Sequence, residues 1–118
     1  MPPQPLTRIT ILLPFPTTLE QYFVVNDVVE SLAKFSGGVT SSLESEPQFR
    51  GSWYDEEDEE IKGDLNLLLF SDAPLAVNSE LISYLEELKL DCQYRLQEKI
   101  IWITLHNVDR IVEGDYQI

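Results

Sequence analysis

A chain of 118 residues with 8 Lys or Arg and 21 Asp or Glu carries a net charge of −13, which repels nucleic acid and anionic membranes at long range. Its length allows one domain, residues 1–118, and its 43% apolar content excludes disorder over most of the chain. We find neither a signal peptide nor an apolar run of about 20 residues, and the single cysteine cannot form an internal disulfide. We therefore expect a soluble cytoplasmic protein, whose acidic surface allows a basic protein partner without requiring one.

The N-terminal third predicts a strand followed by a helix. Residues 8–15 place every second side chain on one apolar face of a strand that ends at Pro14. Thr17 and Glu20 fit a capping box, which begins a helix that stops at the glycine pair 37–38. This helix carries an apolar stripe made of Val25, Val28, Val29, Leu32 and Phe35.

The middle of the chain predicts an interrupted strand and an acidic loop. Residues 39–55 are extended in character, with a break at Pro47 and either a bulge or a close backbone approach at Gly51. Residues 55–60 are six consecutive acids, which repel one another and should project into water as a loop. Ca²⁺ or Mg²⁺ binding is the alternative, but calcium loops space their ligands on alternate residues around a central glycine, and here Gly63 lies beyond the acids.

The second half predicts a central strand, a helix and a last strand. Residues 64–74 form a short apolar run bounded by a glycine and a proline, which is typical of a strand buried on both faces. Asn78 or Ser79 is the N-cap of the helix that follows, and the last strand covers residues 99–106 and ends at the turn-forming Asn107. This second helix has an apolar stripe made of Leu81, Leu85, Leu88, Cys92 and Leu96.

The predicted order of elements is strand, helix, strand, strand, helix, strand. This order is typical of the ferredoxin-like α+β fold, βαββαβ, in which a four-stranded antiparallel sheet carries two helices on one face. We expect residues 1–6 and 114–118 to be loosely ordered tails.

Three segments resemble small bacterial ferredoxin-like proteins of unassigned function. They are residues 35–40 (FSGGVT), residues 51–55 (GSWYD) and residues 99–103 (KIIWI). The resemblance spans residues 8–106 and implies the same fold, but it implies no catalytic residue.

Candidate chemistry is sparse in this sequence. His106, the only histidine, is able to act as a general base or metal ligand, but no second His or Cys lies near it in the sequence. Cys92 falls on the apolar stripe of the second helix, where burial makes a thiol unreactive. No phosphate-binding loop, dinucleotide fingerprint or nucleophile elbow is present, so we predict no cofactor.

The sheet face without helices carries the strongest functional signal. Strand alternation places apolar side chains on it that are too numerous to leave in water: Leu12, Leu68, Phe70, Ile100 and Trp102. A second copy of the chain is the most economical cover, because one self-complementary patch suffices for a symmetric dimer.

Two functions follow from this face. The first is a non-catalytic, oligomeric or partner-binding protein, and the second is a small cofactor-independent enzyme with a cavity on the same face. The residues expected to line that interface or pocket are His106, Trp102, Phe70, Leu68, Trp53 and Tyr54.

Overall fold

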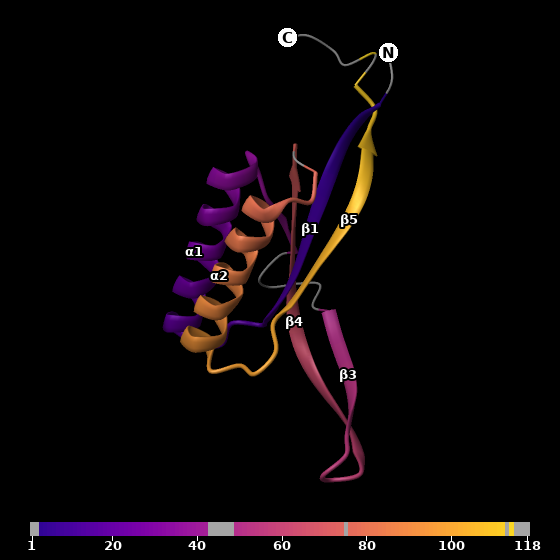
Figure 1. Cartoon of the computed structure of the whole chain (residues 1–118). Coiled ribbons are helices and arrows are strands. Elements are labelled where there is room, and N and C mark those ends of the chain that lie inside the picture. The colour runs from indigo at the N-terminus through magenta and orange to yellow at the C-terminus, as the bar shows by residue number, and fades with distance from the viewer. Residues whose placement is uncertain (1–2, 43–48, 75, 113, 115–118) are drawn as a thin grey trace.

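A computed structural model describes residues 3–42, 49–74, 76–112 and 114 of the chain. Two helices and five strands form within these residues (Figure 1). In chain order they are β1 (Gln4–Pro14), α1 (Leu19–Ser36), β2 (Thr40–Ser41), β3 (Phe49–Asp55), β4 (Glu60–Ala73), α2 (Ser79–Leu96) and β5 (Trp102–Arg110). Neither of the two helices is long and apolar enough to cross a membrane.

The strands form one antiparallel sheet with the spatial order β2-β4-β1-β5, and β3 also pairs with β4. Both helices lie on the same face of this sheet (Figure 1). The predicted ferredoxin-like α+β fold is therefore confirmed, with five strands in place of four. The extra strand arises because the predicted interrupted strand pairs with β4 as two separate pieces; its expected break at Pro47 lies outside the described residues.

The ladder between β1 and β5 extends further than the sequence predicts. Gln4 pairs with Arg110 at the far end of the β1–β5 ladder, so the expected loose tail is wrong for residues 4–6. Asn107 pairs with Thr7 inside that ladder and makes no turn. Both errors have one cause, since polar residues extend a strand readily when a long partner offers its backbone groups for hydrogen bonding.

Both helices are capped at both ends. Thr18, not Thr17, caps α1: its hydroxyl accepts from the Gln21 N–H at 3.2 Å, and the Gln21 side chain accepts from the Thr18 N–H in return. Gly37 ends this helix with φ at 101°, as predicted. Asn78 caps α2 by accepting from the Leu81 N–H at 2.9 Å, which confirms the predicted N-cap.

The core lies between the helices and the helix-covered face of the sheet. The two helices contact each other through the stacked rings of Phe35 and Tyr84, with centroids 4.0 Å apart. The Tyr84 hydroxyl also lies 2.7 Å from the Ser31 hydroxyl, while burial raises the pKa of this tyrosine. The core side chains that come from the sheet are Ile9, Ile11, Leu13, Leu67, Leu69 and Ala73, and Ile101 joins them from the position just before β5.

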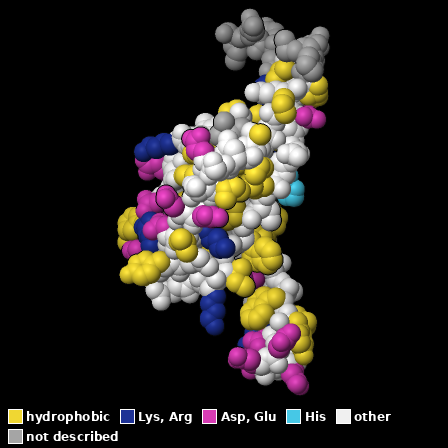
Figure 2. Space-filling model, in the orientation of Figure 1, with side chains coloured by type: hydrophobic (Ala, Val, Ile, Leu, Met, Phe, Trp, Pro, Cys, Tyr) yellow, Lys and Arg dark blue, Asp and Glu magenta, His cyan; other side chains and the backbone are white. Residues whose placement is uncertain are grey.

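A hairpin projects beyond the helices (Figure 1). We call it the arm; it consists of β3, the turn at residues 56–59 and the first half of β4, residues 60–66. Trp53, Tyr54 and Ile61 on the arm are exposed, and acidic side chains gather at its tip (Figure 2). Residues 56–59 of the acidic run therefore lie in a projecting turn, as predicted, whereas Asp55 and Glu60 belong to β3 and β4 and pair with each other.

Candidate functional site

Three rows of side chains cover the helix-free face of the sheet, which we call the open face. The strand register sets each row across β4, β1 and β5. The rows are Asp72, Arg8 and His106; Phe70, Thr10 and Thr104; and Leu68, Leu12 and Trp102. The first row is polar, whereas the last is entirely apolar.

The side chains of the apolar row are less buried than the sequence predicts. Leu68 and Leu12 are half-buried, and Trp102 is 63% exposed. The prediction that the central strand is buried on both faces is therefore wrong for this chain, because the helices cover one face and nothing among the described residues covers the other. Ile100 lies just before β5 and is exposed as well.

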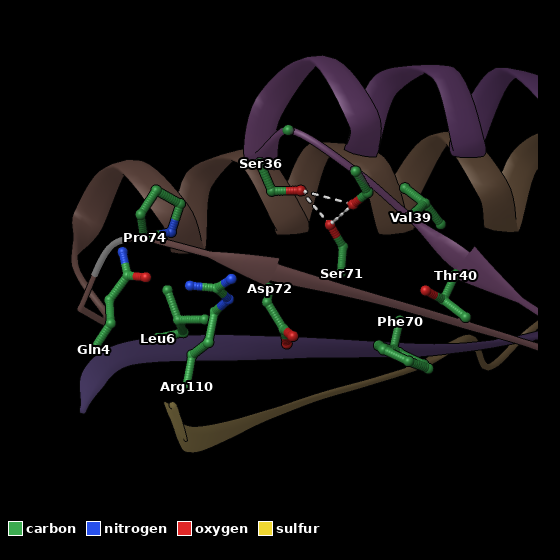
Figure 3. Close-up of a pocket in the computed structure, with 12 residues that line it drawn as sticks. Gln4, Leu6, Ser36, Val39, Thr40, Phe70, Ser71, Asp72, Pro74 and Arg110 are labelled. Atoms are coloured by element: carbon green, nitrogen blue, oxygen red, sulfur yellow. Dashed lines mark hydrogen bonds between the residues drawn. The ribbon is translucent and has the colours of Figure 1, made fainter. Parts of the chain in front are cut away.

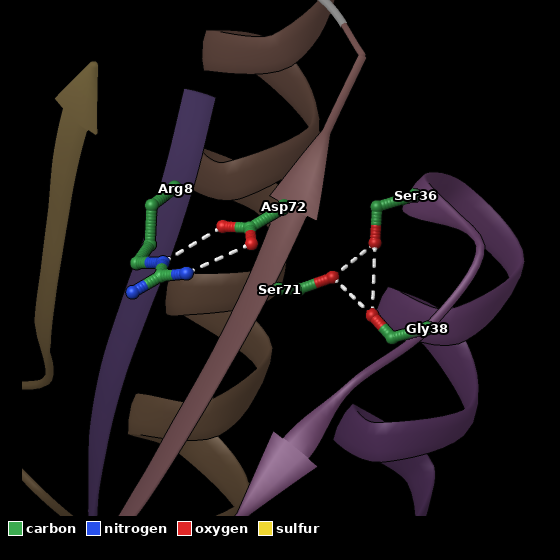
Figure 4. A network of polar contacts seen from close by, with 5 residues as sticks. All are labelled: Arg8, Ser36, Gly38, Ser71 and Asp72. Atoms are coloured by element: carbon green, nitrogen blue, oxygen red, sulfur yellow. Dashed lines mark hydrogen bonds and ion pairs between the residues drawn. The ribbon is translucent and has the colours of Figure 1, made fainter. Parts of the chain in front are cut away.

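The polar row is held by a bidentate ion pair. The Arg8 Nε donates to Asp72 Oδ1 at 2.8 Å, and its Nη2 donates to Asp72 Oδ2 at 2.9 Å (Figure 4). The Arg8 guanidinium also stacks over the Phe70 ring, 4.4 Å from its centroid. These hydrogen bonds lower the pKa of the Asp72 carboxyl and raise that of Arg8, while partial burial opposes both shifts.

A pocket of about 550 Å³ lies at the polar end of the open face, where it wraps around the edge of β4. Its walls come from Gln4 and Leu6 of β1, residues 36–40, residues 70–72 with Pro74, and Arg110. Figure 3 shows the Arg110 side chain reaching into this pocket from the end of β5. The pocket forms here because β2 stops pairing with β4 at Phe70, which leaves the next part of the β4 edge open among the described residues.

The inner wall of the pocket is a cluster of hydroxyl groups (Figure 4). The hydroxyls of Ser36 and Ser71 contact each other, and the Ser71 hydroxyl donates to the carbonyl oxygen of Gly38. The Ser36 hydroxyl donates to the Leu32 carbonyl at 2.8 Å and lies 3.3 Å from the Gly38 carbonyl oxygen. These bonds fasten the end of α1 to β4, so we assign the two serines a positioning role for the loop that forms the wall.

The structure brings four of the six predicted site residues together. His106, Trp102, Phe70 and Leu68 share the open face. Trp53 lies on the same side of the sheet but on the arm, and it pairs with Lys62 across the hairpin.

Tyr54 lies apart from these residues, and the pocket is lined mostly by others. Tyr54 points to the opposite side of the sheet, because neighbouring residues of a strand alternate. Of the six predicted residues, Phe70 lines this pocket and His106 does not.

Several pocket residues could not be found from the sequence. Gln4 lies in the expected N-terminal tail, Arg110 lies beyond the expected end of the last strand, and Thr40 lies in the expected interrupted strand, to which the sequence assigns no role. The glycine pair 37–38 was the one available signal. It marks a helix end, but nothing local shows that two other strand ends meet it there.

The acids at the arm tip are partly paired. The Lys62 ammonium lies 2.8 Å from Asp55 Oδ2 and also contacts Asp58. Asp55 Oδ1 accepts from the Glu57 N–H at 2.9 Å and from the Asp58 N–H at 3.2 Å. The hydrogen bond to Lys62 lowers the pKa of Asp55 most strongly. Within the part of the chain that the structure describes, no three His, Cys, Asp or Glu side chains are grouped so as to hold a metal ion.

Cys92 is buried, as its place on the helix stripe predicts. Burial is the main cause that raises the pKa of its thiol to about 11, and the neighbouring charge of Asp91 adds to the shift. A thiol that stays protonated at neutral pH is a poor nucleophile. This cysteine therefore acts as a small apolar core residue.

Comparisons with known proteins identify the fold of this chain but not its family. No protein-family model and no curated protein sequence matches the chain. Among solved structures it is similar to the periplasmic divalent cation tolerance protein CutA from Archaeoglobus fulgidus, with a TM-score of 0.55 and 12% identity over 92% of this chain and 88% of that one. CutA1 from Oryza sativa gives a TM-score of 0.57 and 13% identity over 90% and 82% of the two chains.

A further solved structure of this fold is an enzyme. A phage SAM lyase in complex with S-methyl-5'-thioadenosine gives a TM-score of 0.57 and 8% identity over 94% of this chain and 93% of that one. The sequence resemblance to ferredoxin-like proteins is thus confirmed at the level of the fold, although the CutA neighbours have a named role. By its fold, this chain is a ferredoxin-like α+β protein similar in structure to CutA.

Proposed function

We propose that this chain is a non-catalytic protein that associates with a second copy of itself through the open face. One observation carries the proposal: the row of Leu12, Leu68 and Trp102 runs across β1, β4 and β5 on the face of the sheet that has no helix over it. Antiparallel sheets that meet water on one face normally present polar side chains there. A contiguous apolar row instead marks a surface that another chain covers.

The charge distribution favours a second copy as the cover. Two molecules with a net charge of −13 repel each other, so they approach best through a surface that lacks net charge. The three rows of the open face contain two charged side chains, Arg8 and Asp72, and these neutralise each other. Acidic side chains gather instead at the arm tip and over the helices (Figure 2). A symmetric dimer would bury the one face that does not repel its copy.

The shared fold does not select a function. The proteins similar in structure include cation tolerance proteins and a lyase, and one fold carries many activities. We therefore rest the proposal on the open face alone. The proposal also places the assembly in the cytoplasm as a single-domain protein, in keeping with its one buried, unpaired cysteine.

Sedimentation equilibrium of the full chain tests the proposal. We expect a dimer at micromolar concentration, and we expect Trp102→Glu to weaken its association by about 30-fold or more, the usual effect of losing a buried aromatic anchor. Trp102 is exposed in the single chain, so this change should leave the fold intact, which circular dichroism checks.

Tyr94→Glu is the matched control. Tyr94 is an aromatic residue of α2, 79% exposed and remote from the open face, so the same type of substitution should leave the association unchanged. A wild-type chain that remains monomeric at 100 times the concentration expected for dimerisation, or an equal loss in the two variants, would contradict the proposal.

A further inference from the structure

The arm carries two aromatic side chains on the side that continues the open face. Phe49 pairs with Asn66 of β4, and Trp53 pairs with Lys62. Strand alternation places both rings on the same side of the sheet as Leu68, and both are exposed in the single chain. Together with the apolar row they make one apolar surface that continues from the sheet onto the arm. A contiguous exposed surface of this kind marks an interaction site.

Trp53 and the pocket lie at equal distances from the apolar row, in opposite directions along β4. Lys62, which pairs with Trp53, is six residues before Leu68, and Pro74 of the pocket is six residues after it. At a rise of about 3.3 Å per residue, both lie about 20 Å from the row. They also share one edge of β4, because β2 and β3 both pair on the edge opposite to β1. A two-fold axis along the row therefore brings Trp53 of each copy to the pocket of the other.

The acidic tips decide between two symmetric arrangements. When two identical sheets pack face to face, the two-fold axis runs either along the strands or across them. An axis along the strands places the two arms together, so the six acids of residues 55–60 in each copy repel those of the other. An axis across the strands, along the apolar row, sends the two tips to opposite ends of the dimer. They are then about 50 Å apart, far beyond the screening length of about 10 Å, so this arrangement is favoured.

The chemistry of the pocket suits an indole ring. Leu6, Val39 and Phe70 provide half-buried apolar walls around a hollow of about 550 Å³. Gln4 and Thr40 are exposed at the rim, where their side-chain oxygens offer acceptors for an indole N–H. The serine cluster fixes the loop of residues 36–40, so this wall is formed before the second copy arrives.

The pocket is also continuous with the open face. Phe70 and Asp72 line the pocket and belong to the rows of that face. An association that covers the open face therefore closes over the pocket as well. The group that fills the pocket in such an assembly comes from the second copy.

We propose that, in the dimer, the arm of each copy reaches along the partner's sheet and seats Trp53 in the partner's pocket. This proposal rests on the proposed self-association and adds a distant contact to it. Each copy gives one anchor and receives one, as a two-fold interface requires. The opposite side of the arm, which carries Tyr54 and Leu65, stays in water.

Sedimentation equilibrium of the full chain with two neighbouring substitutions tests the proposal. Trp53 and Tyr54 are adjacent on β3 and both exposed, but they point to opposite sides of the arm. Trp53→Ala should weaken dimerisation by about 30-fold, the usual effect of losing a buried aromatic anchor, while Tyr54→Ala should leave it unchanged. An equal effect of the two substitutions would overturn the proposal.

A double-mutant cycle locates the contact that Trp53 makes. Leu6→Ala shortens the apolar wall of the pocket and should itself weaken dimerisation by about tenfold. When Trp53 of one copy packs on Leu6 of the other, the double variant loses little more affinity than Trp53→Ala alone, because both changes remove the same contact. Losses that multiply would place Trp53 away from the pocket and contradict the proposal.

Amide hydrogen exchange of the unaltered chain keeps the test valid if Trp53→Ala loosens the arm itself. Exchange at residues 49–55 should slow as the concentration rises from the monomer to the dimer range, because a seated arm opens less often. Exchange that stays independent of concentration in a chain that does dimerise would overturn this proposal alone. The self-association would then still stand on the effect of Trp102→Glu, whereas a chain that remains monomeric overturns both.

Discussion

The two halves of β4 lie in two different regions of the molecule. One half lies in the arm, and the other lies in the rest of the sheet with its two helices, which we call the body. In the body, Leu67 and Leu69 are 1% and 0% exposed, whereas in the arm Leu65 and Ile61 are 47% and 70% exposed. All four side chains lie on the same side of one continuous strand. The helices lie over the body of the sheet, and the arm projects beyond them (Figure 1). Strand pairing therefore sets the backbone of β4, while packing from other elements decides which of its residues are core.

The two regions also differ in how their strands are supported. In the body, β4 pairs with β1 on one side and with β2 on the other. In the arm, β4 pairs with β3 along its whole length, and β1 reaches it at the inner end, where Asn66 pairs with Pro14. A two-stranded hairpin is marginally stable in water by itself. The arm is held in shape because β4 continues into the core, and we expect it to open locally long before the body unfolds.

The largest expected effect separates the two halves of β4 directly. Leu69→Ala removes a fully buried side chain and should lower the free energy of unfolding by about 2–5 kcal/mol, whereas Leu65→Ala should lower it by less than about 1 kcal/mol. Urea unfolding of both variants measures the difference. Equal losses of unfolding free energy in the two variants would contradict this prediction, because they would mean that the Leu65 side of the arm is packed against another molecule in solution.

The second prediction concerns the stability of the body at alkaline pH. The pKa of Cys92 is raised from its ordinary 9.0 to about 11, so the folded chain keeps its thiol protonated while the unfolded chain ionises. The stability that this thiol contributes is therefore complete below pH 9 and is lost as pH rises toward 11, by up to about 3 kcal/mol. Urea unfolding at pH 7 and 10.5, with reductant present, measures the loss. Cys92→Ala should reduce the pH dependence in this range, and an unchanged dependence would contradict the assignment.

The third prediction compares one ion pair from each region. Asp72→Asn in the body should cost about 1 kcal/mol, since its pair with Arg8 is bidentate but partly open to water. The folded pKa of Asp72 lies below its ordinary 3.8, so its contribution is present above pH 4 and is lost as pH falls further. Asp55→Asn in the arm should change global stability less and speed amide hydrogen exchange in the arm. A larger global loss for Asp55→Asn would contradict this order.

The smallest effect concerns the arm tip. Replacing Glu56, Glu57, Glu59 and Glu60 by glutamine keeps Asp55 and Asp58, which contact Lys62, and removes four mutually repelling charges. We expect a slight gain in arm stability at low ionic strength, measured by hydrogen exchange, and we expect salt to abolish it. A loss of stability in the isolated protein would instead indicate that the glutamates hold an ion or a basic segment.

The sequence predicts the body better than the site. Alternation in β1 and the helical stripe of α2 report which residues face the core, because both depend on local spacing. The start of α1 is less certain from sequence, since Thr17 with Glu20 and Thr18 with Gln21 both fit a capping box. The structure uses the second pair, and the Gln21 side chain also accepts from the Thr17 N–H at 2.8 Å.

The pocket could not be predicted because its parts are distant in sequence. Gln4, Thr40 and Arg110 come together only through the β1–β5 register and the point at which β2 leaves β4. Neither depends on a local pattern. The open face was predictable, in contrast, because each of its rows follows from strand alternation once the fold class is known.

The continuity of β4 through the body and the arm has a mechanical consequence. A pull on the tip along the arm travels through β4 into the body and loads its eight pairs with β1 in shear, so they resist together. A sideways pull on β3 instead unzips its seven pairs with β4 one after another. The arm is therefore strong along its length and weak across it.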